Sequence, residues 1–214
     1  MAKHVCIVMM LAMATVIPAH AQSDDFGIWT EASIEKKLSK KLTIDADAEL
    51  RTRDDGFGEI DRWSVGIGAS YKLTKWLKAS VGYALLNDNN HKLNDKQTKY
   101  ADYWGLRHRL NVSLTASQDF GEYRDDHTYA GKGSNKWRNR LQLKYKLTKQ
   151  WRPFVNAEST IGGSGLDKMR YALGTEYRLT KQHSFELKYL YQHIYKDDTE
   201  GNCHVVGIGY SYSF

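Results

Sequence analysis

The chain has 214 residues, 41% of them hydrophobic and 26% charged, with a formal net charge of +6. These averages and a mean hydropathy of −0.61 are typical of an ordinary soluble protein. Beyond residue 21, however, no apolar run approaches the roughly 18 residues that a spanning helix needs, which excludes an α-helical membrane protein. Membrane-spanning strands are not excluded, because 6 Trp, 14 Tyr, 6 Phe and only 2 Pro form a composition typical of β-structure.

The first 21 residues have the features of a secretory signal peptide. Lys3 supplies a basic start, residues 5–17 are apolar, and Ala19 and Ala21 form a small-x-small ending. We predict cleavage near Ala21, which leaves residues 22–214 as a single exported domain. Only Cys203 then remains, so no disulfide framework is expected and the residue is interpreted as partly buried and inert.

A recurring tetrapeptide divides the rest of the chain into hairpin-sized units. The four clear copies are Lys37-Leu38-Ser39-Lys40, Lys72-Leu73-Thr74-Lys75, Lys146-Leu147-Thr148-Lys149 and Arg178-Leu179-Thr180-Lys181, and Ser113-Leu114-Thr115 is a degraded fifth copy. The spacing of 32 to 41 residues suits one β-hairpin and one loop per repeat. Each copy is therefore predicted to be a short turn at the same rim.

Strict alternation of apolar and charged residues on both sides of each copy predicts strands with two unlike faces. In residues 42–51, for example, every second residue is apolar and its neighbours are Asp45, Asp47, Glu49 and Arg51. With the turn centred two residues past the motif leucine, Leu38 pairs with Leu42, Leu73 with Leu77, and Leu179 with His183. Apolar positions then pair with apolar positions across each hairpin.

The height of the apolar face matches a membrane. Trp63 precedes Leu73 by ten residues, and the same spacing separates Trp104 from Leu114 and Trp137 from Leu147. At ~3.3 Å per residue and a tilt of about 45°, this distance is roughly 23 Å. Outer-membrane barrels have an apolar band of about 25 Å flanked by aromatic residues. The sequence therefore predicts an all-β, antiparallel, up-and-down transmembrane barrel with short periplasmic turns and longer extracellular loops.

The strand count leaves one conflict. Six strands run toward the short turns, ending at 38, 73, 114, 147, 179 and 214, and five run away, whereas single-chain bacterial barrels have even numbers. Either residues 26–38 lie partly in the lumen or along the rim, or the barrel breaks the parity rule. We predict 10 to 12 strands, with longer loops at 52–60, 87–103, 130–135, 161–168 and 195–203.

The last predicted strand alternates up to a terminal aromatic residue, at Val206, Ile208, Tyr210, Tyr212 and Phe214. This pattern resembles the C-terminal signal that the outer-membrane assembly machinery reads in bacterial barrels. The expected partners are accordingly outer-membrane lipids, the barrel-assembly machinery and periplasmic chaperones, and the expected location is the bacterial outer membrane.

Several segments, taken together, resemble the family known as domain of unknown function 2490. They are residues 26–30, 57–64, 103–115, 168–171 and 183–187. The resemblance covers nearly the whole chain after the signal and implies an exported, outer-membrane barrel. It implies no activity, so it assigns no functional residues. Residues 119–130 depart from the family pattern because they look shorter and more charged than the strand expected there.

Charged residues at the predicted inward positions form the candidate site. They are Asp45, Asp47, Glu49, Arg51, Arg107, Arg109, Arg138, Arg140, Lys144, Lys146, Arg170, Glu176 and Arg178. Charges of both signs inside a low-dielectric tube must pair, be hydrated or bind a ligand. One interpretation is a structural barrel with a self-neutralised, largely plugged lumen. The other is a narrow, anion-leaning pore or binding lumen built on the Arg- and Lys-rich strands around 104–115 and 136–147.

Other function classes have weaker support. A lipid hydrolase at the outer wall would use Ser159, His108 and Asn139, with Asn139 opposite Ser159 across a hairpin. A soluble ligand-binding barrel would carry apolar rather than charged residues inside. The cations lie in turns and inside the tube, so no basic patch suits nucleic acid. No spacing of ligating residues indicates a metal or another cofactor.

Overall fold

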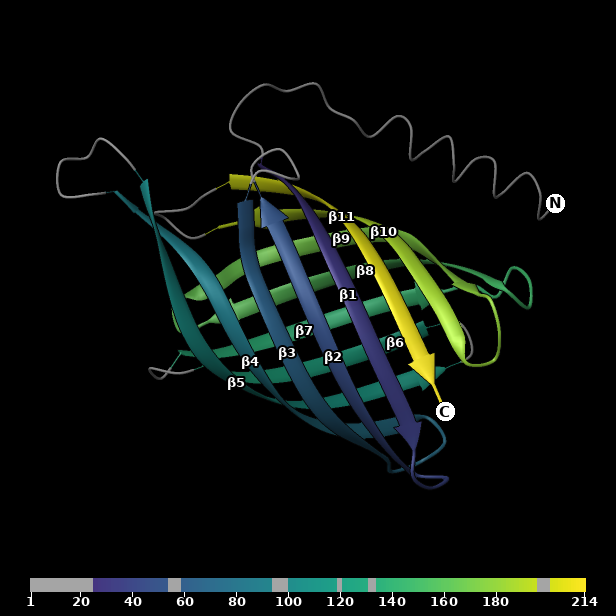
Figure 1. Cartoon of the computed structure of the whole chain (residues 1–214). Helices are drawn as coiled ribbons and strands as arrows, with labels where there is room; N and C mark the ends of the chain where they lie inside the picture. The colour runs from purple at the N-terminus through teal and green to yellow at the C-terminus, as the bar shows by residue number, and fades with distance from the viewer. Residues whose placement is uncertain (1–24, 54–58, 94–99, 119–120, 131–133, 196–200) are drawn as a thin grey trace.

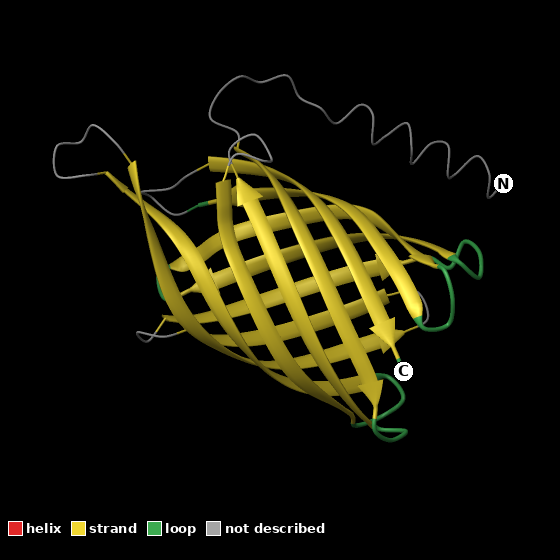
Figure 2. Ribbon diagram, viewed as in Figure 1, coloured by secondary structure: helices red, strands yellow, loops and turns green. Residues whose placement is uncertain are grey.

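A computed structural model describes residues 25–53, 59–93, 100–118, 121–130, 134–195 and 201–214. The predicted signal peptide lies outside these residues. The described chain consists of strands joined by short connections (Figure 2). The strands are β1 (Asp25–Lys37), β2 (Leu42–Arg53), β3 (Glu59–Lys72), β4 (Leu77–Leu93), β5 (Tyr100–Gln118), β6 (Gly121–Ala130), β7 (Ser134–Lys144), β8 (Trp151–Gly162), β9 (Gly165–Arg178), β10 (His183–Ile194) and β11 (Gly201–Ser213).

The strands form a closed barrel in which sequence neighbours pair antiparallel and β1 closes the ring against β11 (Figure 1). The β1–β11 pairing is parallel and runs from Asp25 opposite Cys203 to Glu35 opposite Ser213. This result confirms the predicted barrel and the range of strands, and it places residues 26–37 in the wall. The barrel therefore breaks the parity rule, because closing an up-and-down barrel with an odd strand number forces one parallel pair.

The repeated tetrapeptide forms turns whose Ser or Thr hydroxyl accepts backbone hydrogen bonds. In the first turn, Leu38 donates its N–H to the Leu42 carbonyl at 3.0 Å, and the Ser39 Oγ accepts the Leu42 N–H at 2.9 Å. The hydroxyls of Thr74, Thr148 and Thr180 accept the equivalent N–H groups at 3.0, 2.9 and 3.0 Å. The predicted hairpin pairings are confirmed. The hydrogen bonds also explain why Ser or Thr occupies the third position of the motif.

The degraded fifth copy is not a turn. The prediction that a strand ends at residue 114 is wrong, because β5 continues to Gln118 and pairs with β6 from Gln118 opposite Gly121. Thr115 is 1% exposed on the inner face of the wall instead of capping a turn. The alternation simply continues through Ala116 and Ser117, with no lysine after the threonine to mark a solvated tip.

Two predicted loops are largely strand. Residues 87–93 and 100–103, expected in the longest loop, extend β4 and β5 into a long hairpin, in which Leu93 pairs with Tyr100. Residues 161–168, also expected as a loop, contain a tight turn, with Gly162 paired with Gly165 and Gly165 at a φ of 112°. Because only glycine adopts that φ readily, Gly165 suits this reversal.

The two faces of the wall differ in chemistry, as predicted. The outer face exposes large apolar side chains on many of the strands, including Ile44, Ile67, Val81, Leu110, Leu141 and Leu187. The inner face is mainly polar and charged. Within the described residues, no helix has the length and apolar character needed to cross a membrane.

Candidate functional site

The strand register brings the predicted lumen charges to the inner face of the barrel. Along one row of paired residues, for example, Arg51 lies opposite Arg62, and Arg62 lies opposite Asp88. Three predicted members lie at the margin of this set: Lys144 and Arg178 are the last residues of β7 and β9, and Lys146 follows the end of β7. The other predicted charges lie within strands and line the lumen.

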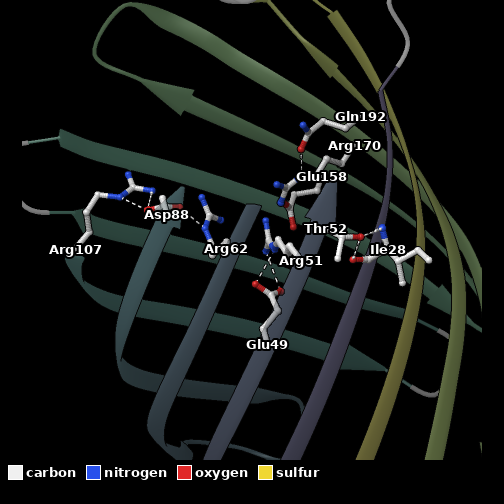
Figure 3. A network of polar contacts seen from close by, with 10 residues as sticks. All are labelled: Ile28, Glu49, Arg51, Thr52, Arg62, Asp88, Arg107, Glu158, Arg170 and Gln192. Atoms are coloured by element: carbon white, nitrogen blue, oxygen red, sulfur yellow. Dashed lines mark hydrogen bonds and ion pairs between the residues drawn. The ribbon is translucent and has the colours of Figure 1, made fainter. Parts of the chain in front are cut away.

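An ion-paired cluster crosses the half of the lumen near the long β4–β5 hairpin (Figure 3). Asp88 on β4 accepts hydrogen bonds from Arg62 on β3 and Arg107 on β5, so it bridges two guanidinium groups. Asp88 is only 6% exposed. A carboxylate this buried is stable when its oxygens are paired and hydrogen-bonded, which the two arginines accomplish.

A second group of paired charges lies on β7, β8 and β9. Glu158 is 3.0 Å from the Nη1 of Arg170 and 3.5 Å from the Nε of Arg138. Arg170 also donates its Nε–H to the side-chain oxygen of Gln192 on β10 at 2.7 Å. Glu158, Arg170 and Gln192 are all buried, so these contacts link three neighbouring strands at the inner wall (Figure 3).

Trp29 on β1 joins the two groups. Arg51 stacks on its ring with 3.8 Å between the guanidinium carbon and the ring centre, and Arg170 lies 5.2 Å from the same centre. Arg51 is held in turn by Glu49, at 2.7 and 2.8 Å. Trp29 and Cys203 pack against a small apolar cluster of Ala172, Leu190 and Val205. The predicted partly buried position of Cys203 agrees with this packing.

Carboxylates gather on the inner face of β1 and β2. Glu31 lies opposite Glu49, and Glu35 lies opposite Asp45, so acidic residues pair directly across the two strands. We define Glu31, Glu35, Asp45 and Asp47 as the acidic wall. Apart from Glu49, no carboxylate of these strands forms an ion pair with a described residue.

Inward glycines of β3 make room for this wall. A Cβ on Gly66 would lie 2.6 Å from the Asp47 Oδ1, and a Cβ on Gly68 would lie 2.5 Å from the Asp45 Oδ2. Real Cβ atoms do not approach other atoms so closely. The two carboxylates therefore occupy the space that a side chain at position 66 or 68 would need. The two side chains therefore lie flat against β3.

Guanidinium groups occupy the opposite side of the lumen. In the ring order, four strands separate β7 from β2 on one side and four separate β7 from β1 on the other, so β7 faces the acidic wall. Arg140 lies on β7, whereas Arg109 lies on β5, which only β3 and β4 separate from β2. Their Nε atoms are buried without a hydrogen-bond partner among the described residues.

Several inward side chains remain accessible to water. The Arg107 side chain is 47% exposed and that of Lys136 is 39% exposed, although both point into the barrel and both form ion pairs. Glu31, Glu35 and Asp45 are also exposed. A lumen filled by protein atoms would bury these groups. These inward side chains are therefore not fully enclosed by the other described residues.

Sequence analysis missed part of this site. Glu31, Arg62, Asp88, Glu158 and Gln192 were not proposed, although each follows the alternation of its strand. Glu31 was missed because the placement of residues 26–38 was left open. The others were missed because ion pairing between strands depends on register, which periodicity within one strand does not provide.

The residues proposed for lipid hydrolysis do not come together. Asn139 does lie opposite Ser159, as expected from the hairpin register. His108, however, is on β5, which two strands separate from β8, and its Nδ1 forms a 2.6 Å hydrogen bond with the hydroxyl of Tyr83. A nucleophile needs its base within hydrogen-bond reach. This arrangement does not provide one for Ser159.

The proposed assembly signal forms most of β11. Val206, Ile208, Tyr210 and Tyr212 occupy alternate positions opposite Ile28, Thr30, Ala32 and Ile34 of β1. Phe214 follows the strand and donates its backbone N–H to the Glu35 carbonyl at 2.9 Å. Ile208 and Phe214, each 48% exposed, are among the exposed large apolar side chains of the barrel.

Comparison with known proteins gives a family and a fold. The family model described as "Protein of unknown function (DUF2490)" matches residues 26–202. Among solved structures, the chain is similar to the translocator domain of the autotransporter NalP from Neisseria meningitidis, with 13% identity and a TM-score of 0.53 over 79% of this chain and 73% of that one. This likeness shows the fold of an outer-membrane barrel.

Weaker similarities involve OmpT, an outer membrane protein of Vibrio cholerae. Its in-vitro folded form matches with 12% identity and a TM-score of 0.37 over 73% of this chain. The form expressed in the outer membrane matches with 13% identity and a TM-score of 0.38 over 71% of this chain. The chain spans about half the length of OmpT, 52% and 54% in the two structures. No curated protein matches the chain.

Proposed function

The chain belongs to the DUF2490 family, and on this premise we propose that its barrel is a narrow, water-filled, anion-leaning passage for small solutes in the bacterial outer membrane. The short-turn rim then faces the periplasm and the long β4–β5 hairpin faces outward. Residues 1–21 direct the chain to export, and the assembly machinery inserts the barrel.

The observation that carries this proposal is the accessibility of inward charges. Arg107 keeps 47% of its side chain exposed while it pairs with Asp88, and Asp45 is exposed although it faces the lumen. Charged side chains in a packed plug would be desolvated at a cost of several kcal/mol per ion. Hydrated charges that line a tube instead lower the energy of an ion that enters it.

The proposed preference for anions rests on β5 and β7, whose inward positions carry arginines and no carboxylate. Asp88 and Glu158 each form ion pairs with two arginines, so neither carboxylate is available to bind a further cation. Arg109 and Arg140 form no ion pair with a described residue. An anion that passes β5 and β7 meets guanidinium groups in a low-dielectric enclosure, where their attraction is stronger than in bulk water.

Planar-bilayer recording of the refolded protein tests the proposal. We expect single-channel steps in KCl, and a reversal potential on the chloride side under a salt gradient. Replacement of Arg109 and Arg140 together by Gln should move the reversal potential toward the potassium side. Joint replacement of Lys149 and Lys181 by Gln is the matched control, because it also removes two cations but these lie exposed in turns at the rim.

Folding of each sample is verified by heat-modifiable migration on a detergent gel. A folded barrel that produces no conductance steps would contradict the proposal and support a purely structural barrel with a plugged lumen. Conductance with a potassium-side reversal potential in the unmodified protein would contradict the anion preference alone.

A further inference from the structure

We propose that the lumen holds a binding site for a compact, doubly charged oxyanion, such as the phosphate group of a small solute, beside Thr160 and Lys168 and close to the turn between β8 and β9. This inference rests on the proposed passage and specifies the class of anion that the passage takes.

Lys168 on β9 is a cation without a carboxylate partner. It forms no ion pair with a described residue. The charged groups that act on it most strongly are all cations, namely Arg170, Arg138, Lys136 and Arg51. Because Lys168 is only partly exposed, water screens this repulsion incompletely. An anion beside the ammonium group would relieve it.

Two buried carboxylates near this lysine are already engaged by other cations. Glu158 lies 3.0 Å from the Nη1 of Arg170 and 3.5 Å from the Nε of Arg138. Asp167 accepts a 2.7 Å hydrogen bond from the Nζ of Lys136. Together with the unpaired lysine, four cations in this described part of the wall therefore share two carboxylates. Two positive charges remain, and a dianion would neutralise both.

Thr160 lies between these cations and has an unused hydroxyl group. It is opposite Arg138 on β7 and opposite Lys168 on β9. Thr160 is 1% exposed, and its Oγ1 has no hydrogen-bond partner among the described residues. Buried hydroxyl groups without a partner are rare, because they lose the hydrogen bonds that water provides. An anion held between the two cations would supply the acceptor that this hydroxyl lacks.

The arginines beside the site are held in fixed positions. Arg170 donates its Nε–H to Gln192 at 2.7 Å and lies 5.2 Å from the ring centre of Trp29. Arg51 contacts the same ring and is neutralised by Glu49, so it adds no uncompensated charge (Figure 3). Groups that are already ordered lose little conformational entropy when a ligand binds.

The arrangement favours an anion whose two charges lie in one small group. The excess positive charges surround a single hydroxyl group, so a ligand with two distant charges would leave one of them unmatched. A phosphate group carries about 1.5 to 2 negative charges near neutral pH and has three strong acceptor oxygens. Lysine and arginine both bind such oxygens, and the threonine hydroxyl can donate to a third. A monoanion would leave one positive charge uncompensated.

Calorimetric titration of the refolded barrel in a neutral detergent at low ionic strength tests the inference. Methyl phosphate and methyl sulfate have the same shape, but at about pH 8 the phosphate ester carries two negative charges and the sulfate ester carries one. We expect methyl phosphate to bind about tenfold more tightly, because an additional interaction with a charged group contributes about that factor. Equal affinity for the two esters, or binding of neither, would overturn the inference.

Lys168→Met tests the contribution of the unpaired cation. The variant should bind methyl phosphate about tenfold more weakly and should largely lose the discrimination between the two esters. Lys78→Met is the matched control, because Lys78 also forms no ion pair with a described residue but lies opposite Thr115 and Lys72, beside the turn between β3 and β4. An equal loss of affinity in the two variants would overturn the assigned site.

Thr160→Val separates binding from packing, since valine removes the hydroxyl and keeps nearly the same shape. We expect methyl phosphate to bind about tenfold more weakly, while the urea midpoint of the ligand-free barrel does not fall, because the hydroxyl has no partner to lose. Thr175→Val is the matched control. The Oγ1 of Thr175 is also buried without a partner in the described chain, but this residue is near the opposite end of β9. Unchanged affinity in a folded Thr160→Val barrel would overturn the assigned site.

The KCl conductance of the same samples distinguishes this inference from the proposed function. A folded barrel that conducts but binds the two esters equally would overturn the inference and leave the anion passage standing. A folded barrel that prefers methyl phosphate but produces no conductance steps would overturn the passage and support the binding site.

Discussion

Arg51 lies 3.8 Å from the ring centre of Trp29, and this stacking joins the first two strands of the barrel to Arg170 on β9. Arg170 reaches the same ring over β10 and β11, whose inward residues there include Gly207 opposite Trp29. Trp29 therefore stabilises the barrel where β1 pairs in parallel with β11, a pairing that we call the parallel seam. It does so from inside the barrel, where most other residues are polar.

Removal of Trp29 should weaken this closure. We expect Trp29→Ala to destabilise the folded barrel by about 3 kcal/mol, because a large aromatic side chain that packs against Val205 and two guanidinium groups is lost. The measurement is the temperature at which the protein loses its folded migration on a detergent gel. Trp76→Ala is the matched control, since Trp76 is 56% exposed in a turn. An equal shift in both variants would contradict the assigned role.

Loss of Glu158 should be more damaging than loss of a rim carboxylate. Glu158→Leu leaves Arg138 and Arg170 without their shared partner, and breaking a buried pair costs about 3–5 kcal/mol. Glu59→Leu removes a partner of Arg53 with 42% of its side chain exposed, where an ion pair contributes about 0–1 kcal/mol. Urea unfolding in detergent micelles, followed by tryptophan fluorescence, should show this difference. Similar midpoints for the two variants would count against it.

The turn hydroxyls should contribute to stability through backbone capping. Thr74→Ala, Thr148→Ala and Thr180→Ala each remove hydrogen bonds to two backbone N–H groups, of Trp76 and Leu77 in the first case. We expect each substitution to cost about 1 kcal/mol, whereas Thr→Ser at the same positions should be nearly neutral. The same urea titration measures both series. A loss with Ser as large as that with Ala would show that the methyl group, not the hydroxyl, is responsible.

Addition of a methyl group at the inward glycines should alter the passage without breaking the strand. Gly66→Ala and Gly68→Ala place a Cβ 2.6 and 2.5 Å from the carboxylates of Asp47 and Asp45, so these side chains must swing into the lumen. We expect a lower single-channel conductance. Gly82→Ala is the matched control on β4, because its Cβ would meet only the Ile67 carbonyl at 3.6 Å. A conductance change in the control of the same size would contradict this explanation.

Lipid hydrolysis is not expected from this outer wall. Ser159 and His108 lie on strands that β6 and β7 separate, and His108 bonds to Tyr83. Purified barrel incubated with phospholipid vesicles should release no fatty acid above the background of a heat-unfolded sample. Release that disappears in Ser159→Ala would refute this expectation.

Much of the fold was predictable because local pattern dictates it. Alternation assigned the inner and outer faces, and the spacing of the motif leucines located four turns correctly. The end of β5 was misplaced because Ser113-Leu114-Thr115 copies the motif without its lysine, and the alternation continues past it to Gln118. Periodicity within the strand is therefore a better indicator of where β5 ends than the incomplete motif.

The site itself was predictable only in part. Arg107 and Arg170 could be assigned to the lumen from their own strands, but their partners could not, because Asp88 and Gln192 approach them through register between strands. The contact of Arg170 with Trp29 depends further on how the ring closes. Such contacts follow from the stagger of the whole barrel, which no single segment encodes.

The parallel seam between β1 and β11 also affects the order in which the strands of the barrel can pair. Each antiparallel pair joins neighbours in the chain, and the motif turns allow those hairpins to form locally. The seam instead joins residues far apart, as the 2.7 Å contact between Ser33 and Ser211 illustrates across 178 positions. We therefore expect its hydrogen bonds to form last, so that β1 and β11 each keep one unpaired edge until every hairpin is in place.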